Sequence, residues 1–94
     1  MIPAMIHRAH LSKQNSEKMV IWGDGSPLRQ VIYSEDLARL IMWSLENWKS
    51  DEPFMAINSE EHSILNIAKI ICNSFDIEDE NIIFDSSKPM GQHR

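Results

Sequence analysis

Residues 19–38 have the sequence MVIWGDGSPLRQVIYSEDLA, in which an apolar run, a glycine-rich turn and a helix start follow one another. The run Met19–Trp22 predicts a short strand, and the turn formers at 23–27 favour a loop after it. A second strand is expected at 30–33. Ser34 is a good N-cap residue and two acids follow it, so the stretch predicts strand, loop, strand and then helix.

Helix and strand patterns alternate along the rest of the chain. Apolar residues at helical spacing predict helices at 3–11, 34–48 and 63–76. Short apolar runs at 54–58 and 81–84 predict two further strands. The order of helix, strand, strand, helix, strand, helix, strand predicts an α/β fold with some parallel pairing.

The composition is that of an ordinary globular protein. The 94 residues are 43% hydrophobic and 24% charged, and 9 Lys+Arg against 14 Asp+Glu give a net charge of -5. This charge opposes non-specific attraction to nucleic acid or to anionic lipid. The chain start lacks the pattern of a signal peptide, and no apolar run is long enough to span a membrane. We therefore expect a soluble, cytoplasmic protein with no nucleic-acid or membrane partner.

Groups that could perform chemistry are scarce. The glycines at 23, 25 and 91 form no dinucleotide-binding fingerprint, and the single Tyr33 has no lysine four positions later. His7 and His10 lie three residues apart, but no further ligand at a suitable spacing accompanies them, so no metal site is predicted. The histidines at 62 and 93 are interpreted as solvated loop residues. The single cysteine is interpreted as a small hydrophobic residue, and no catalytic residue is assigned.

Trp22 and Arg29 are the candidate binding residues. The tryptophan is predicted at a strand end and the arginine where the chain returns after the glycine turn, so that together they could hold a ring and a diphosphate. The planar guanidinium suits this role because it donates two parallel hydrogen bonds to phosphate oxygens. The spacing alone favours a simpler alternative, a hairpin in which Trp22 is a core residue and Arg29 is a surface residue.

Three segments carry a resemblance to a known family. Residues 22–38 match the pattern W-G-x-G-x-P-x-R-x-[FVI]-[LI]-[HY]-x-x-D-L-A, and the segments IPAMIHR at 2–8 and FDSSKPMG at 84–91 are similar to two other family motifs. Together they resemble the GDP-L-fucose synthases, which are extended short-chain dehydrogenases of the NAD-dependent epimerase/dehydratase family. The similarity covers nearly the whole chain.

The resemblance implies a parent enzyme that converts GDP-4-keto-6-deoxy-D-mannose to GDP-L-fucose by epimerisation and NADPH-dependent reduction. It implies an incomplete Rossmann-type fold, in which residues 1–94 are a single fragment forming the C-terminal, substrate-binding portion. The half that binds NADP and carries the reduction machinery would lie upstream, so the isolated chain is predicted to be inactive. A homodimeric parent enzyme is also implied.

The resemblance further implies substrate-binding roles for three residues: charge pairing for Arg8, ring packing for Trp22 and a bidentate diphosphate contact for Arg29. Met90 stands where the family has an aspartate that contacts substrate. Two alternatives stay open: a fragment of another nucleotide-sugar epimerase or dehydratase, and a truncated, non-catalytic product.

Overall fold

The computed structural model describes residues 1–57, 59–89 and 91, so Met90 and His93 lie outside the described residues. The chain forms two compact units. The first unit contains Met1–Arg29 and His62–Arg94, and the second unit contains Gln30–Glu61.

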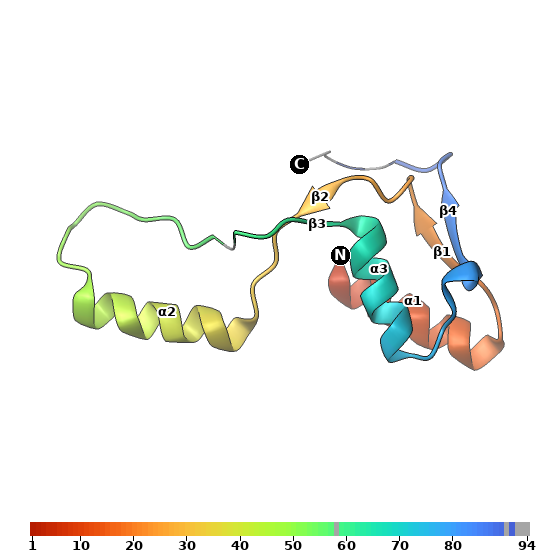
Figure 1. Ribbon diagram of the computed structural model, residues 1–94, viewed down its shortest axis with the longest axis horizontal. Coiled ribbons are helices and arrows are strands. Elements are labelled where there is room, and N and C mark those ends of the chain that lie inside the picture. The colour runs from red at the N-terminus through yellow and green to blue at the C-terminus, as the bar shows by residue number, and fades with distance from the viewer. Residues whose placement is uncertain (58, 90, 92–94) are drawn as a thin grey trace. The chain divides into compact units, whose positions relative to one another are not determined.

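Two short sheets organise the first unit. Strand β1 (Met19–Trp22) pairs in parallel with strand β4 (Ile82–Asp85), and this register places Trp22 opposite Asp85. Strand β2 (Leu28–Arg29) pairs antiparallel with strand β3 (His62–Ser63). Figure 1 shows β1 and β4 side by side, although they come from opposite ends of the chain. The predicted α/β class and the parallel pairing are confirmed.

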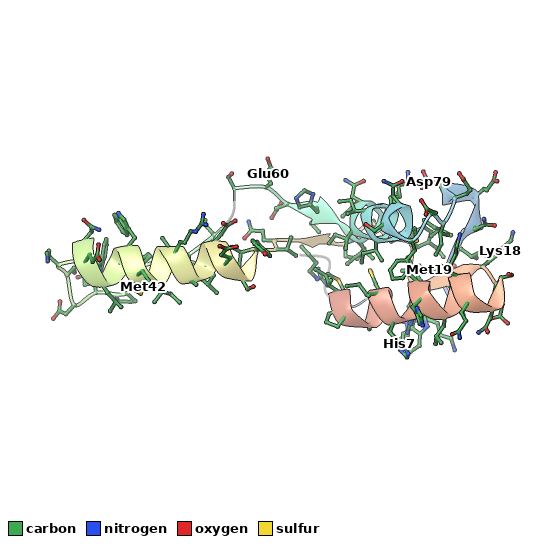
Figure 2. All side chains as sticks on the ribbon, turned by 90° about the horizontal axis from the view of Figure 1, so that it is seen from below. His7, Lys18, Met19, Met42, Glu60 and Asp79 are labelled. Atoms are coloured by element: carbon green, nitrogen blue, oxygen red, sulfur yellow. The ribbon has the colours of Figure 1, made fainter. Side chains whose placement is uncertain are left out.

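The core of the first unit lies where helix α1 (Ile2–Asn15) meets helix α3 (Ile64–Ser74) and β1. Met19 and Cys72 are the largest fully buried side chains, and the Cys72 Sγ lies 3.1 Å from the Met19 Sδ. Figure 2 shows Met19 beside α1, on the side of that helix that faces α3. The interpretation of the cysteine as a small core residue is confirmed by its complete burial.

The helix ends of the first unit have clear local causes. Pro3 lies in the first turn of α1, where its missing N–H costs no helical hydrogen bond. This helix continues to Asn15, beyond its predicted end, and stops at Ser16, which has a left-handed φ of 55°. Helix α3 begins after Ser63, whose hydroxyl accepts a hydrogen bond from the Asn66 amide at 3.1 Å, as predicted.

The second unit consists of helix α2 (Ser34–Asn47) and extended chain. Its N-cap is Tyr33 and not Ser34 as predicted, and no side chain caps the helix. None of the described residues of this unit is buried. The predicted apolar face is therefore open, with Leu45 74% and Ile41 51% exposed.

Two strand predictions were wrong. Residues 30–33 are not a strand, because pairing with β3 already ends at Arg29. The apolar run at 54–57 is not a strand either, and its residues are exposed. Strand β3 instead covers His62–Ser63, so His62 is not a loop residue. In the part of the chain that the structure describes, no helix has the length and apolar character needed to cross a membrane.

A cavity lined by Arg8, Trp22 and Arg29

The loop between β1 and β2 is fixed by backbone hydrogen bonds to both sides. The Gly23 amide donates to the Asp85 carbonyl at 2.9 Å, which ties the loop to β4. The carbonyls of Gly25 and Pro27 accept from the first two amides of α3, those of Leu65 and Ile64, each at 2.9 Å. These amides have no partner within their own helix, so the loop also satisfies the helix start.

Gly25 is required by close packing as well as by conformation. Its φ is +80°, and a Cβ at this position would lie 2.7 Å from the Phe84 Cε1 and 3.1 Å from the Leu65 Cβ. A larger residue would collide with both neighbours in a backbone conformation that side chains disfavour. The glycine turn predicted from the sequence is thus held against β4 and α3.

Trp22 is a surface residue and not a core residue. Its side chain is 51% exposed, and its strand pairs with β4 rather than forming a hairpin with β2. The hairpin alternative was therefore wrong about Trp22. The Arg8 guanidinium carbon lies 5.2 Å from the centroid of the indole ring, which is a cation–π distance. Helix α1 thus supplies the positive charge and β1 supplies the ring.

Arg29 lies in β2 opposite His62 and is partly buried. Its Nη1 donates a hydrogen bond to the Leu28 carbonyl at 2.7 Å, which folds the side chain back on its own strand. Its Nη2 lies close to Gly91, because a Cβ on that glycine would be 3.7 Å away. The guanidinium is therefore bordered by the segment that follows β4.

The structure brings the three predicted binding residues to one cavity of the first unit. This cavity has a volume of about 410 Å³, within the range of small-molecule sites, which begins at about 300 Å³. The described residues that line it include no aspartate or glutamate, although the chain has a net charge of -5. Its wall includes Arg8, Trp22, Arg29, Ile64, Pro89 and Gly91.

The charge of this cavity favours an anionic ligand with an apolar part. Two guanidinium groups supply fixed positive charge, and the indole and Ile64 supply apolar surface. A smaller cavity of about 300 Å³ shares Arg8 and Trp22 with it and, unlike the first, also has an acid, Glu17, among its lining residues. That the three residues bind substrate stays a prediction.

Sequence reasoning connected the segment after β4 with substrate only through the family motif, in which Met90 takes the place of an aspartate that contacts substrate. Pro89 and Gly91 line the cavity, and the Lys88 ammonium lies 5.9 Å from the centroid of the Trp22 ring. The segment was noticed only as part of a family motif. Its place beside the ring depends on the pairing of β4 with β1, which no local pattern reveals.

The described residues offer no other reactive centre. Nowhere among them do three or more histidine, cysteine or acidic side chains gather as metal ligands would. His7 is exposed, and Figure 2 shows it on the side of α1 away from α3. Burial, and then the charge of Asp79, raises the pKa of Cys72, which keeps this thiol protonated and unreactive.

Comparison with known proteins identifies the family. The profile of the NAD dependent epimerase/dehydratase family matches residues 1–67. The chain belongs to this family. It is 38% identical to a GDP-L-fucose synthase of Dictyostelium discoideum, over 99% of the chain and 29% of that protein.

Solved structures agree with this assignment. The chain superposes on a GDP-L-fucose synthetase from Naegleria fowleri with a TM-score of 0.90 and 39% identity, over 99% of the chain and 29% of that protein. A second structure of the Naegleria fowleri protein, bound to NADP, gives a TM-score of 0.89 at 39% identity, over 98% of the chain and 29% of that protein. The chain therefore spans somewhat less than a third of the length of these relatives, and its fold is part of a Rossmann-type epimerase/reductase fold.

Proposed function

We propose that this chain supplies the sugar-nucleotide-binding side of a GDP-L-fucose synthase. The parent activity would be the conversion of GDP-4-keto-6-deoxy-D-mannose to GDP-L-fucose by epimerisation and NADPH-dependent reduction. The observation that carries the proposal is that Arg8, Trp22 and Arg29 line one cavity whose described lining residues include no acid. The similarity to GDP-L-fucose synthases over 99% of the chain supports the choice of substrate.

Each of the three residues has a distinct task in this proposal. The Arg29 guanidinium exchanges its hydrogen bond to the Leu28 carbonyl for two bonds to the diphosphate. The Trp22 indole packs against a ring of the ligand, because it lines the cavity and its side chain is 51% exposed. Arg8 steadies the indole from α1 and adds positive charge at the cavity edge.

The cofactor proposed for the parent enzyme is NADP, which the Naegleria fowleri relative binds. NADPH supplies the hydride for reduction of the ketone. We assign its recognition mainly to the upstream half of the parent enzyme, since the three glycines of this chain form no dinucleotide-binding turn. The chain by itself is therefore proposed to bind the nucleotide sugar without turning it over.

Calorimetric titration of the chain with GDP-L-fucose tests the proposal. Binding is expected to weaken in Arg29→Ala by about 1.5–3 kcal/mol, the worth of a hydrogen bond to a charged group. Arg39→Ala is the matched control, because Arg39 is an exposed arginine of α2 that pairs with Glu35 at 3.1 Å. Equal affinities of Arg29→Ala and the unaltered chain would remove Arg29 from the site.

Titration with UDP and dTDP sugars tests the alternative of another nucleotide-sugar epimerase or dehydratase. The proposal expects GDP-L-fucose to bind more tightly than either. A preference for UDP or dTDP sugars would reassign the substrate while leaving the cavity in place.

A chimaera tests whether this chain can serve as the sugar-nucleotide-binding part of an active enzyme. In it, this chain replaces the corresponding 29% of the Naegleria fowleri relative, whose fold it matches with a TM-score of 0.90. We expect NADPH oxidation with the keto sugar by the chimaera and none by the 94-residue chain. Inactivity of a folded chimaera that still binds GDP-L-fucose would contradict the proposed role.

A further inference from the structure

A second cation shares the Trp22 ring with Arg8. The Lys88 Nζ lies 5.9 Å from the centroid of the indole, and the Arg8 guanidinium carbon lies 5.2 Å from the same point. Both values fall within the range of cation–π interaction, which ends at about 6 Å. A lysine from the segment after β4 and an arginine from α1 are thereby brought together on one exposed side chain.

A tight turn holds Lys88 in this place. The Lys88 amide donates to the Asp85 carbonyl at 3.2 Å, and the Asp85 carboxylate accepts hydrogen bonds from the amide and the hydroxyl of Ser87. Because Asp85 lies opposite Trp22 in the β1–β4 register, the turn returns the chain toward the indole. The next residue, Pro89, already lines the cavity, so the lysine lies at the cavity edge.

The two cations repel each other, and the indole alone is a weak partner for both. Cation–π contacts at exposed sites are worth only about 0.5–1 kcal/mol each. Asp85 is the acid nearest to Lys88 in sequence, and hydrogen bonds from Ser87 and, to a smaller extent, the charge of Lys88 lower the pKa of its carboxyl group. Its carboxylate therefore divides its interactions between Ser87 and the lysine. Within the part of the chain that the structure describes, the cavity itself is lined by no acid. An anion placed between the ring, the lysine and Arg8 would satisfy both charges at once.

We propose that Lys88 is a further substrate-binding residue, whose ammonium moves from the indole edge to the diphosphate of the bound nucleotide sugar. This inference rests on the proposed function and adds one residue to its site. Four methylene groups allow the ammonium to move without any change in the turn. The lysine would then act with Arg8 and Arg29 as a third source of positive charge.

Titration of the chain with GDP and with guanosine tests this inference. Lys88→Met keeps the length of the side chain and removes its charge, and we expect it to weaken GDP binding about tenfold and guanosine binding not at all. Lys88→Arg restores the charge and should bind GDP within about threefold of the unaltered chain. Lys69→Met is the control, since Lys69 is an exposed lysine of α3 that lies 4.0 Å from Asp79.

The outcomes separate this inference from the proposed function. Unchanged GDP affinity in Lys88→Met, together with weaker binding in Arg29→Ala, would overturn the role of Lys88 alone. No GDP binding by the unaltered, folded chain would overturn the proposed function as well. Circular dichroism distinguishes lost binding from lost folding, and recovery in Lys88→Arg would show that charge is the property that matters.

Discussion

Gly25 lies where the loop between β1 and β2 crosses the Phe84 ring. We predict that Gly25→Ala lowers the free energy of unfolding by about 1–2 kcal/mol for the left-handed conformation and by about 1–3 kcal/mol more for the collision with Phe84 and Leu65. Urea denaturation measures the change. The collision is the larger and more specific of the two effects.

Gly91→Ala measures the cost of the left-handed backbone conformation without the cost of a collision. Gly91 has a similar φ of +74°, but a Cβ there would meet the Arg29 Nη2 at 3.7 Å, an ordinary contact. Only the conformational cost is therefore expected. Equal losses of stability in the two variants would show that the loop moves away from Phe84 without cost.

The Cys72 thiol makes stability fall at alkaline pH. Burial, and then the charge of Asp79, raises the pKa of Cys72 above its ordinary value of 9.0. The unfolded chain therefore loses the thiol proton at lower pH than the folded chain. The contribution of the protonated thiol to the free energy of unfolding is complete below about pH 9 and is lost as the pH rises through the folded pKa. Urea denaturation between neutral and strongly alkaline pH should show the decline.

Cys72→Ala is the comparison for this pH dependence. The variant loses the contact with the Met19 sulfur at every pH, so it is less stable than the unaltered chain at neutral pH. The difference between the two proteins should shrink as the pH rises above 9.0, because alanine does not titrate. If the difference in unfolding free energy between the two proteins stays constant with pH, the Cys72 thiol is not the source of the decline.

Helix starts differ between α3 and α2. Ser63 caps α3 with its hydroxyl, and Ser34 is the first residue of α2 with no capping hydrogen bond. We predict that Ser63→Ala costs about 1 kcal/mol of unfolding free energy, the usual worth of an N-cap. Ser34→Ala should cost much less, and thermal denaturation of the two variants compares them directly.

The beginning of α3 also supports the candidate site. Its first two amides hold the carbonyls of Gly25 and Pro27 in the loop between Trp22 and Arg29. If Ser63→Ala loosens this turn, GDP-L-fucose binding should weaken along with stability. Loss of stability with full binding would show that the loop keeps its shape independently of the cap.

At the scale of the whole molecule, the buried residues among those that the structure describes all belong to the first unit. All of its buried hydrophobic residues come from α1, β1, α3 and the turn after α3, whereas the described residues of the second unit include none that is buried. We predict that amide hydrogens of α3 exchange slowly with solvent and that those of α2 exchange at close to the rate of an unfolded chain. Hydrogen exchange followed by mass spectrometry of the 94-residue chain measures both.

Protection of α2 comparable to that of α3 would contradict this prediction. Binding of GDP-L-fucose provides an internal comparison, because the cavity is formed wholly within the first unit. Added ligand should slow exchange in the loop between β1 and β2 and leave α2 unchanged.

Much of the site could be predicted from the sequence because its parts are local signals. The apolar run of β1, the glycine turn and the arginine that follows lie within eleven residues, 19–29, and act through short-range preferences. Arg8 came from family resemblance alone. For Arg29 the sequence pattern allowed a diphosphate role, and the resemblance favoured it over a plain surface arginine. The second strand was misplaced because two-residue strands carry no periodicity of their own.

The sequence by itself determined the three helices, the strand Met19–Trp22 and the turn that needs glycine, since each depends on neighbours a few residues away. Tertiary structure decided the pairing of β1 with β4, and with it the exposure of Trp22 and the approach of Lys88 to the ring. Strand pairing joins segments about sixty residues apart in this chain, and it is selected by the burial of a shared core that no local pattern encodes.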